Sequence, residues 1–139
     1  MITLPETIKY PDKFLKSPSA SFDGVFDWSW TEGCFGDTRI TPMDLDGMIE
    51  RKGKFLIFET KDIGVPIPKG QMYTFEALYR LDVFTILFVE GKTHPEKLMA
   101  WFQPEFLGGR KETTHKHVDI EYVKFVVESW YVFANGGNL

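Results

Sequence analysis

The sequence has one cysteine, no long apolar run and no excess of basic residues, and each shortage excludes a class of protein. Cys34 is the only cysteine among 139 residues, which rules out an internal disulfide and an all-cysteine metal cage. No stretch approaches the roughly 18 uninterrupted apolar residues of a membrane-spanning helix. The N-terminus lacks the basic start and apolar core of a signal peptide. We therefore expect a cytoplasmic protein with no membrane partner.

Basic residues are outnumbered, with 16 Lys and Arg against 20 Asp and Glu, for a formal net charge of −4. Proteins that hold nucleic acid by its phosphates are usually basic, so this balance argues mildly against such a partner. A small cationic rim, meaning a local group of Lys and Arg side chains, can still bind a short stretch of nucleic acid. Arg51, Lys52, Lys54 and Lys69 are the candidates for that rim, with an ordinary solvated turn as the alternative.

Apolar residues are plentiful, because 43% of the chain is hydrophobic and 16% is aromatic. This is enough to form a core, and 139 residues is the length of one ordinary domain. We expect a single domain over 1–139, which includes an irregular proline-containing arm over 1–20.

Hydrophobic periodicity predicts an alternation of strands and helices along most of the chain. We expect strands over 43–50, 55–61, 82–91 and 96–104, a helix over 71–81 and a C-terminal helix over 118–134. The polar segment 107–117 is predicted to be a loop, with His115 and His117 solvated rather than binding metal. Strand, strand, helix, strand is typical of an α/β (α+β) domain with a mixed central sheet.

Charged residues gather where the apolar strand 55–61 ends. Glu59 and Lys61 are two residues apart and therefore share a face of that strand, as do Asp44 and Asp46 in the preceding one. A hairpin turn at Gly53 would place one of these aspartates beside Glu59. Converging carboxylates repel one another and need a cation, and Mg²⁺ suits oxygen ligands. The backbone carbonyl of Thr60 is a further candidate ligand.

This pattern resembles the PD-(D/E)XK nuclease superfamily over about residues 40 to 91. The features that match are Asp46, then Glu59-Thr60-Lys61 thirteen residues on, then Gln71 at a helix start. The resemblance implies a restriction-endonuclease-like core and Mg²⁺- or Mn²⁺-dependent hydrolysis of phosphodiester bonds. It implies that Asp46 and Glu59 bind metal, that Lys61 is the catalytic lysine and that Gln71 assists.

Two features depart from the superfamily pattern. Many members carry a glutamate on a preceding helix; Glu32 is the best candidate, with Asp37 behind it. The family name also suggests a proline directly before the first aspartate, whereas Met43 separates Pro42 from Asp44 here. The hairpin distance favours Asp46 over Asp44 as the metal ligand.

The expected function is therefore that of a metal-dependent nuclease acting on DNA, similar to small nuclease-like proteins of phages. Cutting of a duplex by so small a domain would favour a homodimer. The alternatives are a non-catalytic phage interaction or assembly protein that retains the fold, and a hydrolase of another phosphate ester. The intact charged set favours the enzyme.

Overall fold

The computed structural model describes residues 27–137, which belong to two compact units that divide between Asp44 and Leu45. The arm expected over 1–20 lies outside the described residues. Within the first unit, the 3₁₀ helix η1 spans Ser29–Thr31 and is followed by turns. The second unit contains every longer helix and strand described below.

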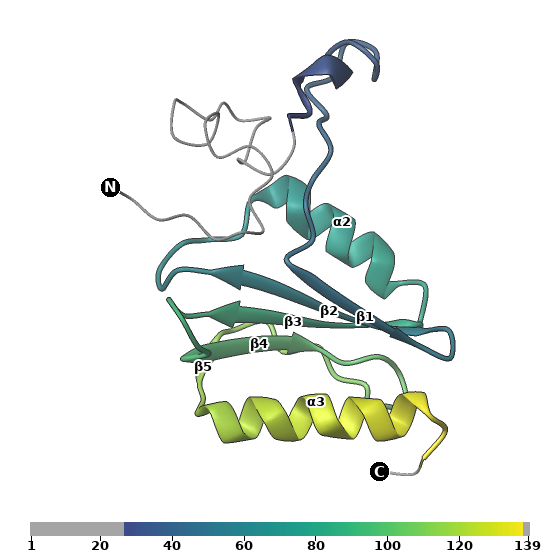
Figure 1. Cartoon of the computed structure of the whole chain (residues 1–139), viewed down its shortest axis with the longest axis vertical. Coiled ribbons are helices and arrows are strands. Elements are labelled where there is room, and N and C mark those ends of the chain that lie inside the picture. Colours follow the sequence, from purple (N-terminus) through teal and green to yellow (C-terminus); the bar gives the residue numbers. More distant parts are fainter. Residues whose placement is uncertain (1–26, 138–139) are drawn as a thin grey trace. The chain divides into compact units, whose positions relative to one another are not determined.

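A five-stranded mixed sheet with order β1-β2-β3-β4-β5 forms the second unit. The strands are β1 (Gly47–Arg51), β2 (Lys54–Lys61), β3 (Phe84–Glu90), β4 (Lys97–Trp101) and β5 (Lys116–His117). Strands β2 and β3 run parallel, and the other neighbours are antiparallel. Helix α2 (Lys69–Tyr79) lies on one side of the sheet and α3 (Ile120–Ala134) on the other (Figure 1). The predicted α+β class is confirmed.

The turn between β1 and β2 has the two-residue form that suits a twisted hairpin. Lys52 and Gly53 both have positive φ, at 51° and 81°, as a type I′ turn requires. The Glu50 carboxylate accepts a hydrogen bond from the Gly53 N–H at 2.9 Å. The predicted turn at Gly53 is therefore confirmed, and it sets the register Gly47 opposite Phe58.

Helix α2 makes the crossover that two parallel strands need. It begins at Lys69, two residues before the predicted start, directly after Pro68. Proline cannot donate a backbone hydrogen bond, and it commonly marks a helix start. Gln71 therefore lies in the first turn, as predicted.

Alternate side chains of the central strands pack against opposite helices. Leu87 and Val89 of β3 belong to the buried cluster that includes Val126 of α3. Phe88 points to the other face, where its ring meets Phe75 of α2 at 5.3 Å between centroids. Both faces of β3 are thus buried, which explains its unbroken apolar sequence.

Helix α3 begins two residues later than predicted, because Asp119 caps it. The Asp119 carboxylate accepts a hydrogen bond from the Tyr122 N–H at 2.9 Å. The spacing of apolar residues in the sequence predicts one inner stripe with Tyr122, Val126 and Trp130 among its members. Val126 and Trp130 are buried, but Tyr122 is 39% exposed. The true inner face also includes Val123. None of the helices in residues 27–137 is long and apolar enough to span a membrane.

The strand expected over 96–104 is shorter, because β4 ends at Trp101. Two other predicted segments were also wrong. The strand expected over 43–50 begins only at Gly47, because the chain bends at Asp46. The loop expected over 107–117 contains β5, which pairs with β4 at the edge of the sheet. Such a two-residue strand leaves no periodic signal in the sequence.

Candidate metal-binding and catalytic site

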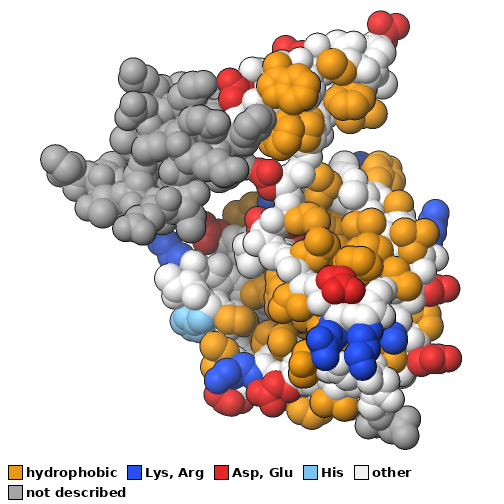
Figure 2. Space-filling view, turned by 45° about the vertical axis from the view of Figure 1, so that its right-hand side comes forward, with side chains coloured by type: hydrophobic (Ala, Val, Ile, Leu, Met, Phe, Trp, Pro, Cys, Tyr) orange, Lys and Arg blue, Asp and Glu red, His pale blue; other side chains and the backbone are white. Residues whose placement is uncertain are grey.

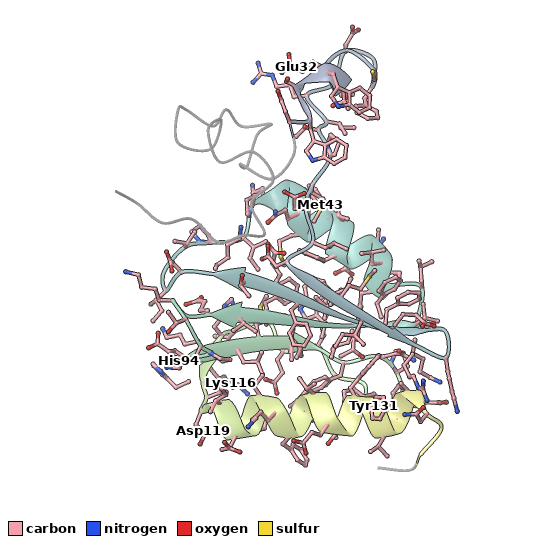
Figure 3. The ribbon with its side chains drawn as sticks, viewed as in Figure 1. Glu32, Met43, His94, Lys116, Asp119 and Tyr131 are labelled. Atoms are coloured by element: carbon pink, nitrogen blue, oxygen red, sulfur yellow. The ribbon has the colours of Figure 1, made fainter. Side chains whose placement is uncertain are left out.

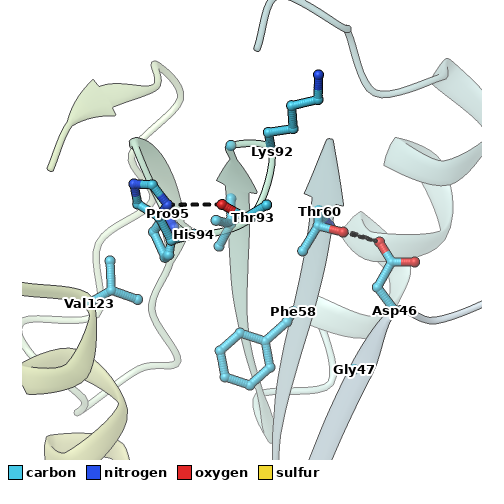
Figure 4. Close-up of a pocket in the computed structure, with 11 residues that line it drawn as sticks. Asp46, Gly47, Phe58, Thr60, Lys92, Thr93, His94, Pro95 and Val123 are labelled. Carbon is cyan, nitrogen blue, oxygen red and sulfur yellow. Dashed lines mark hydrogen bonds between the residues drawn. The ribbon is translucent and has the colours of Figure 1, made fainter. Parts of the chain in front are cut away.

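Asp46 closes the open end of the β1–β2 ladder. Its Oδ2 accepts hydrogen bonds from the backbone N–H and the hydroxyl of Thr60, at 2.8 and 3.0 Å (Figure 4). The Asp46 carboxylate replaces the backbone partner that a longer β1 would supply. Aspartate readily takes this role because its short side chain reaches nearby backbone groups. Continuing the register by one residue places Asp46 opposite Glu59.

Glu59 is a buried carboxyl at the end of an apolar strand. It is 2% exposed, and its Oε2 has no hydrogen-bond partner among the described residues. Its Oε1 lies 3.6 Å from the Lys61 ammonium, whose side chain is 25% exposed. An ion pair to one oxygen leaves the second buried oxygen unsatisfied, which is costly unless another group binds it.

Burial and the neighbouring charge of Asp46 raise the pKa of Glu59 from 4.5 to about 7, against the opposing attraction of Lys61. The Coulombic effect of Asp46 requires the two carboxyls to be close together. Near neutral pH the site therefore holds a carboxyl that is poised between its charged and neutral forms. A bound cation would favour the charged form.

The Thr60 carbonyl points toward the same opening. In a β-strand the N–H and C=O of one residue point to the same side, and the Thr60 N–H points to Asp46. The neighbouring Lys61 carbonyl points the opposite way and accepts the Gly91 N–H at 3.0 Å. Asp46, Glu59 and the Thr60 carbonyl thus offer oxygen atoms at one edge of β2.

No group of three or more His, Cys, Asp or Glu side chains that could hold a metal gathers within residues 27–137. The site contains two carboxylates and lacks histidine or cysteine ligands. This donor set fits Mg²⁺, which binds through one or two carboxylates and keeps several waters, better than it fits Zn²⁺.

Gln71 lies at the end of α2 that follows β2, which is the end nearest Lys61 in the chain. Its Oε1 is buried and has no hydrogen-bond partner among the described residues. Its position in the first helical turn agrees with the expectation. That its amide faces Glu59 and Lys61 stays a prediction.

Glu32 and Asp44 belong to the first unit. Glu32 is exposed and directly follows the single turn of η1, so it is not on the longer preceding helix that the family pattern suggests. Its catalytic role stays a prediction. Asp44 precedes β1 by several residues, and the shared strand face predicted for Asp44 and Asp46 is wrong.

The predicted cationic rim is split between the two ends of the sheet. Arg51, Lys52 and Lys54 lie around the hairpin turn, whereas Glu59 is five residues along β2 from Lys54, or about 17 Å. Figure 2 brings the hairpin side of the molecule forward, with basic side chains among apolar ones. Lys69, by contrast, begins α2 near the carboxylates in the chain.

Two hairpin cations also have partners on α3. Arg51 donates from Nε to the Asn135 side chain at 2.6 Å, and its guanidinium lies 5.6 Å from the Tyr131 ring centre. The Lys54 ammonium lies 5.3 Å from the ring centre of Phe133. Figure 3 labels Tyr131 at this end of the sheet and His94 at the other. Contact between the hairpin cations and DNA stays a prediction.

Sequence reasoning missed Glu90 and its pairing with His115. Glu90 ends β3 in register with Lys61, and its Oε1 lies 3.3 Å from Nδ1 of His115. Its Oε2 accepts the Gly64 N–H at 3.4 Å. The sequence contained a signal for Glu90, because a glutamate follows the apolar residues in both β2 and β3. His115 lies just before β5, as the predicted loop requires, but it pairs with Glu90 and is only 24% exposed. His117 is exposed as predicted, although it belongs to β5.

A cavity of about 470 Å³ opens on the α3 side of the site and shares Asp46 and Thr60 with it. Glu59 and Lys61 do not line it, because their side chains project to the α2 face. The end of β2 therefore separates a charged face from a cavity.

Comparison of the chain with protein-family models, with curated proteins and with solved structures finds no significant match.

Proposed function

We propose that this chain is a metal-dependent nuclease that hydrolyses DNA phosphodiester bonds with Mg²⁺ or Mn²⁺. The observation that carries the proposal is Glu59, a buried carboxyl with one unpartnered oxygen beside a second carboxyl. The cost of removing a buried ion pair from water commonly cancels its attraction, so stability alone gives little reason to bury this charge. The order of Asp46, Glu59, Lys61 and Gln71 supports the PD-(D/E)XK assignment as part of the same proposal.

Asp46, Glu59 and the Thr60 carbonyl would hold the cation. Bound there, it would acidify a coordinated water and stabilise the charge that develops on the phosphate. The two hydrogen bonds from Thr60 fix the Asp46 carboxylate, so that its orientation is set before substrate arrives. Rotation of Asp46 away from Glu59 would require breaking both bonds.

Lys61 would act on the attacking water and on the phosphate. Its ammonium is held near Glu59 at 3.6 Å yet remains partly exposed, so it can contact both the site and a bound substrate. Positive charge placed where negative charge develops stabilises the transition state more than the ground state. Gln71 would supply a neutral hydrogen-bonding group from α2 to the water or to Lys61.

The test is cleavage of a supercoiled plasmid and of a single-stranded oligonucleotide in Mg²⁺, Mn²⁺ or EDTA. We expect cleavage with either metal and none in EDTA. Asp46→Ala should lose both cleavage and metal binding measured by calorimetry, because a site with two carboxylates tolerates little ligand loss. Glu128→Ala is the matched control, since Glu128 is exposed on α3 and is not part of the site.

Failure of the wild type to cut either DNA with any metal would end the nuclease proposal. Metal binding without DNA cleavage, together with hydrolysis of a simple phosphate diester, would favour a hydrolase of another phosphate ester. Absence of both metal binding and hydrolysis would favour a non-catalytic interaction protein. The net charge of −4 and the distant hairpin cations are the features that agree with these alternatives.

A further inference from the structure

The cavity beside Asp46 has an apolar floor and a polar rim. Its volume is about 470 Å³, within the usual range of small-molecule sites. The floor contains Phe58 and Val123, and the rim contains Lys92, Thr93 and His94 (Figure 4). A flat apolar group with polar edges would match this lining.

The turn that forms one wall of the cavity is held firmly. Gly91 donates its N–H to the Lys61 carbonyl at 3.0 Å, and Glu96 donates to the Glu90 carbonyl at 2.9 Å. A Cβ at Gly91 would clash with the His94 carbonyl oxygen, so the turn folds back closely on itself. The wall is thus part of the fold, and its shape exists before any ligand arrives.

The rim gives the expected ligand its charge and its hydrogen bonds. Lys92 is exposed and extends from the rim beyond the strand ends, whereas the Phe58 ring lies deeper (Figure 4). The Thr93 hydroxyl and the His94 ring lie 3.1 Å apart and can each donate or accept. A base that contacts the floor, with its phosphate at Lys92, satisfies all three features. An acyl chain would leave the polar rim without partners.

We infer that this cavity binds one nucleobase of a nucleic acid strand, with the phosphate of that nucleotide at Lys92. The choice of a nucleic acid rests on the proposed function, because Asp46 and Thr60 belong to both the cavity and the carboxylate site. Thr60 projects to the cavity side of β2, and Lys61 projects to the other. A strand that crosses the end of β2 therefore presents a base to the cavity and a neighbouring phosphate to Lys61.

Binding to the full chain with Mg²⁺ tests this inference, using Lys61→Ala to prevent turnover. The probes are thymidine 5′-monophosphate, deoxyribose 5′-phosphate and a short oligothymidylate, each followed by calorimetry and by backbone amide NMR shifts. We expect the base-containing probes to bind and to shift the amides of Thr93, His94 and Val123. The sugar phosphate should bind about tenfold more weakly or worse, because base stacking is lost.

Three further substitutions, each made in that background, locate the ligand. Gly47→Leu places a side chain over Phe58, because a Cβ at Gly47 would already lie 3.5 Å from that ring. We expect it to weaken nucleotide binding about tenfold or more. Lys92→Ala should weaken all three probes severalfold. Lys124→Ala is the matched control, because Lys124 lies exposed on α3 and pairs with Glu121, and it should change nothing.

Equal binding of the sugar phosphate and the nucleotide would overturn the inference, as would unchanged nucleotide binding by both Gly47→Leu and Lys92→Ala. Binding of the mononucleotide but not of the oligonucleotide would overturn the placement within a strand. These results are separate from catalysis. With Gly47→Leu made alone, in a chain that keeps Lys61, DNA cleavage with unchanged KM would count against the cavity while leaving the nuclease proposal intact. Nucleotide binding by a protein that never cuts DNA would support the cavity as a nucleotide site and would count against the nuclease proposal.

Discussion

The two ends of β2 differ in how their charged side chains are satisfied. At the hairpin end, Arg51 and Lys54 contact aromatic rings and a side-chain amide of the C-terminal part of the chain. At the other end, Glu59 is buried with one oxygen unpartnered and Asp46 beside it. The hairpin cations are placed where they contribute to packing, whereas Glu59 is placed where it adds a cost of burial and Asp46 beside it stays exposed.

This difference indicates which end is built for stability and which for binding. An exposed cation over a ring is favourable by about 0.5–1 kcal/mol and requires no further partner. A buried carboxylate with an unfilled oxygen is unfavourable until another group reaches it. The carboxylate end is thus the better candidate for ligand binding, although the hairpin end carries more basic residues.

The largest expected difference between the ends is in catalysis. Lys61→Ala should lower Mg²⁺-dependent DNA cleavage by about 10²–10³-fold, the usual result of removing one electrostatic contact to a transition state. Lys52→Ala, at the hairpin, should lower it by less than about tenfold, because it removes at most one distant phosphate contact. Initial rates on plasmid DNA measure both effects.

Circular dichroism and metal titration are the controls for Lys61→Ala, which should keep its fold and its metal affinity. Lys61→Met adds a side chain of similar length without charge and should be as inactive as the alanine variant. A Lys52→Ala defect as large as that of Lys61→Ala would mean that catalysis does not distinguish the two ends.

The second expected difference is in how stability depends on pH without metal. Because folding raises the pKa of Glu59 from 4.5 to about 7, the folded state favours its neutral form. This contribution is fully present below about pH 4.5 and is lost as pH rises through about 7. We expect the free energy of unfolding in EDTA to fall by up to about 3 kcal/mol across this window.

Urea denaturation at a series of pH values measures this fall. Glu59→Gln should remove most of the decrease, whereas Glu50→Gln, at the hairpin, should leave it in place. Added Mg²⁺ should restore stability near pH 8, because it binds the charged carboxylates. An equal fall in wild type and Glu59→Gln would show that another group carries the pH dependence.

The smallest expected effects come from glycines at the two ends. Gly53→Ala should destabilise the protein by about 1 kcal/mol, because Gly53 has φ of 81° and no atom would crowd the added methyl. Gly70→Ala, in the first turn of α2, also meets open space but has an ordinary φ. It should be neutral or stabilise by about 0.5 kcal/mol. Thermal and urea denaturation distinguish these outcomes, and cleavage should be unchanged by Gly53→Ala.

If Gly53→Ala lowers the stability of the protein and Gly70→Ala does not, the result would support the view that backbone conformation determines the hairpin. Equal destabilisation by both would instead indicate that the start of α2 is as constrained as the hairpin. That result would favour close packing around Gln71.

Local patterns in the sequence were sufficient for the elements that depend on near neighbours. The glycine turn at 53, the apolar strand after it and the proline-bounded start of α2 were all anticipated to within a few residues. The helix near the C-terminus was also anticipated, but its inner face was only partly right, since Val123 rather than Tyr122 is buried. Aromatic residues can lie on either side of an amphipathic helix, so periodicity alone assigns them poorly.

The sequence by itself determined the class of fold and the presence of carboxylates and a lysine at one strand end, because strand alternation and turn chemistry act over a few residues. The tertiary structure decided what those groups meet. It placed Asp46 on Thr60, brought His115 to Glu90 and formed the cavity between a turn and α3. These contacts join residues up to several tens of positions apart, and their geometry depends on how the strands and helices pack, which no local pattern encodes.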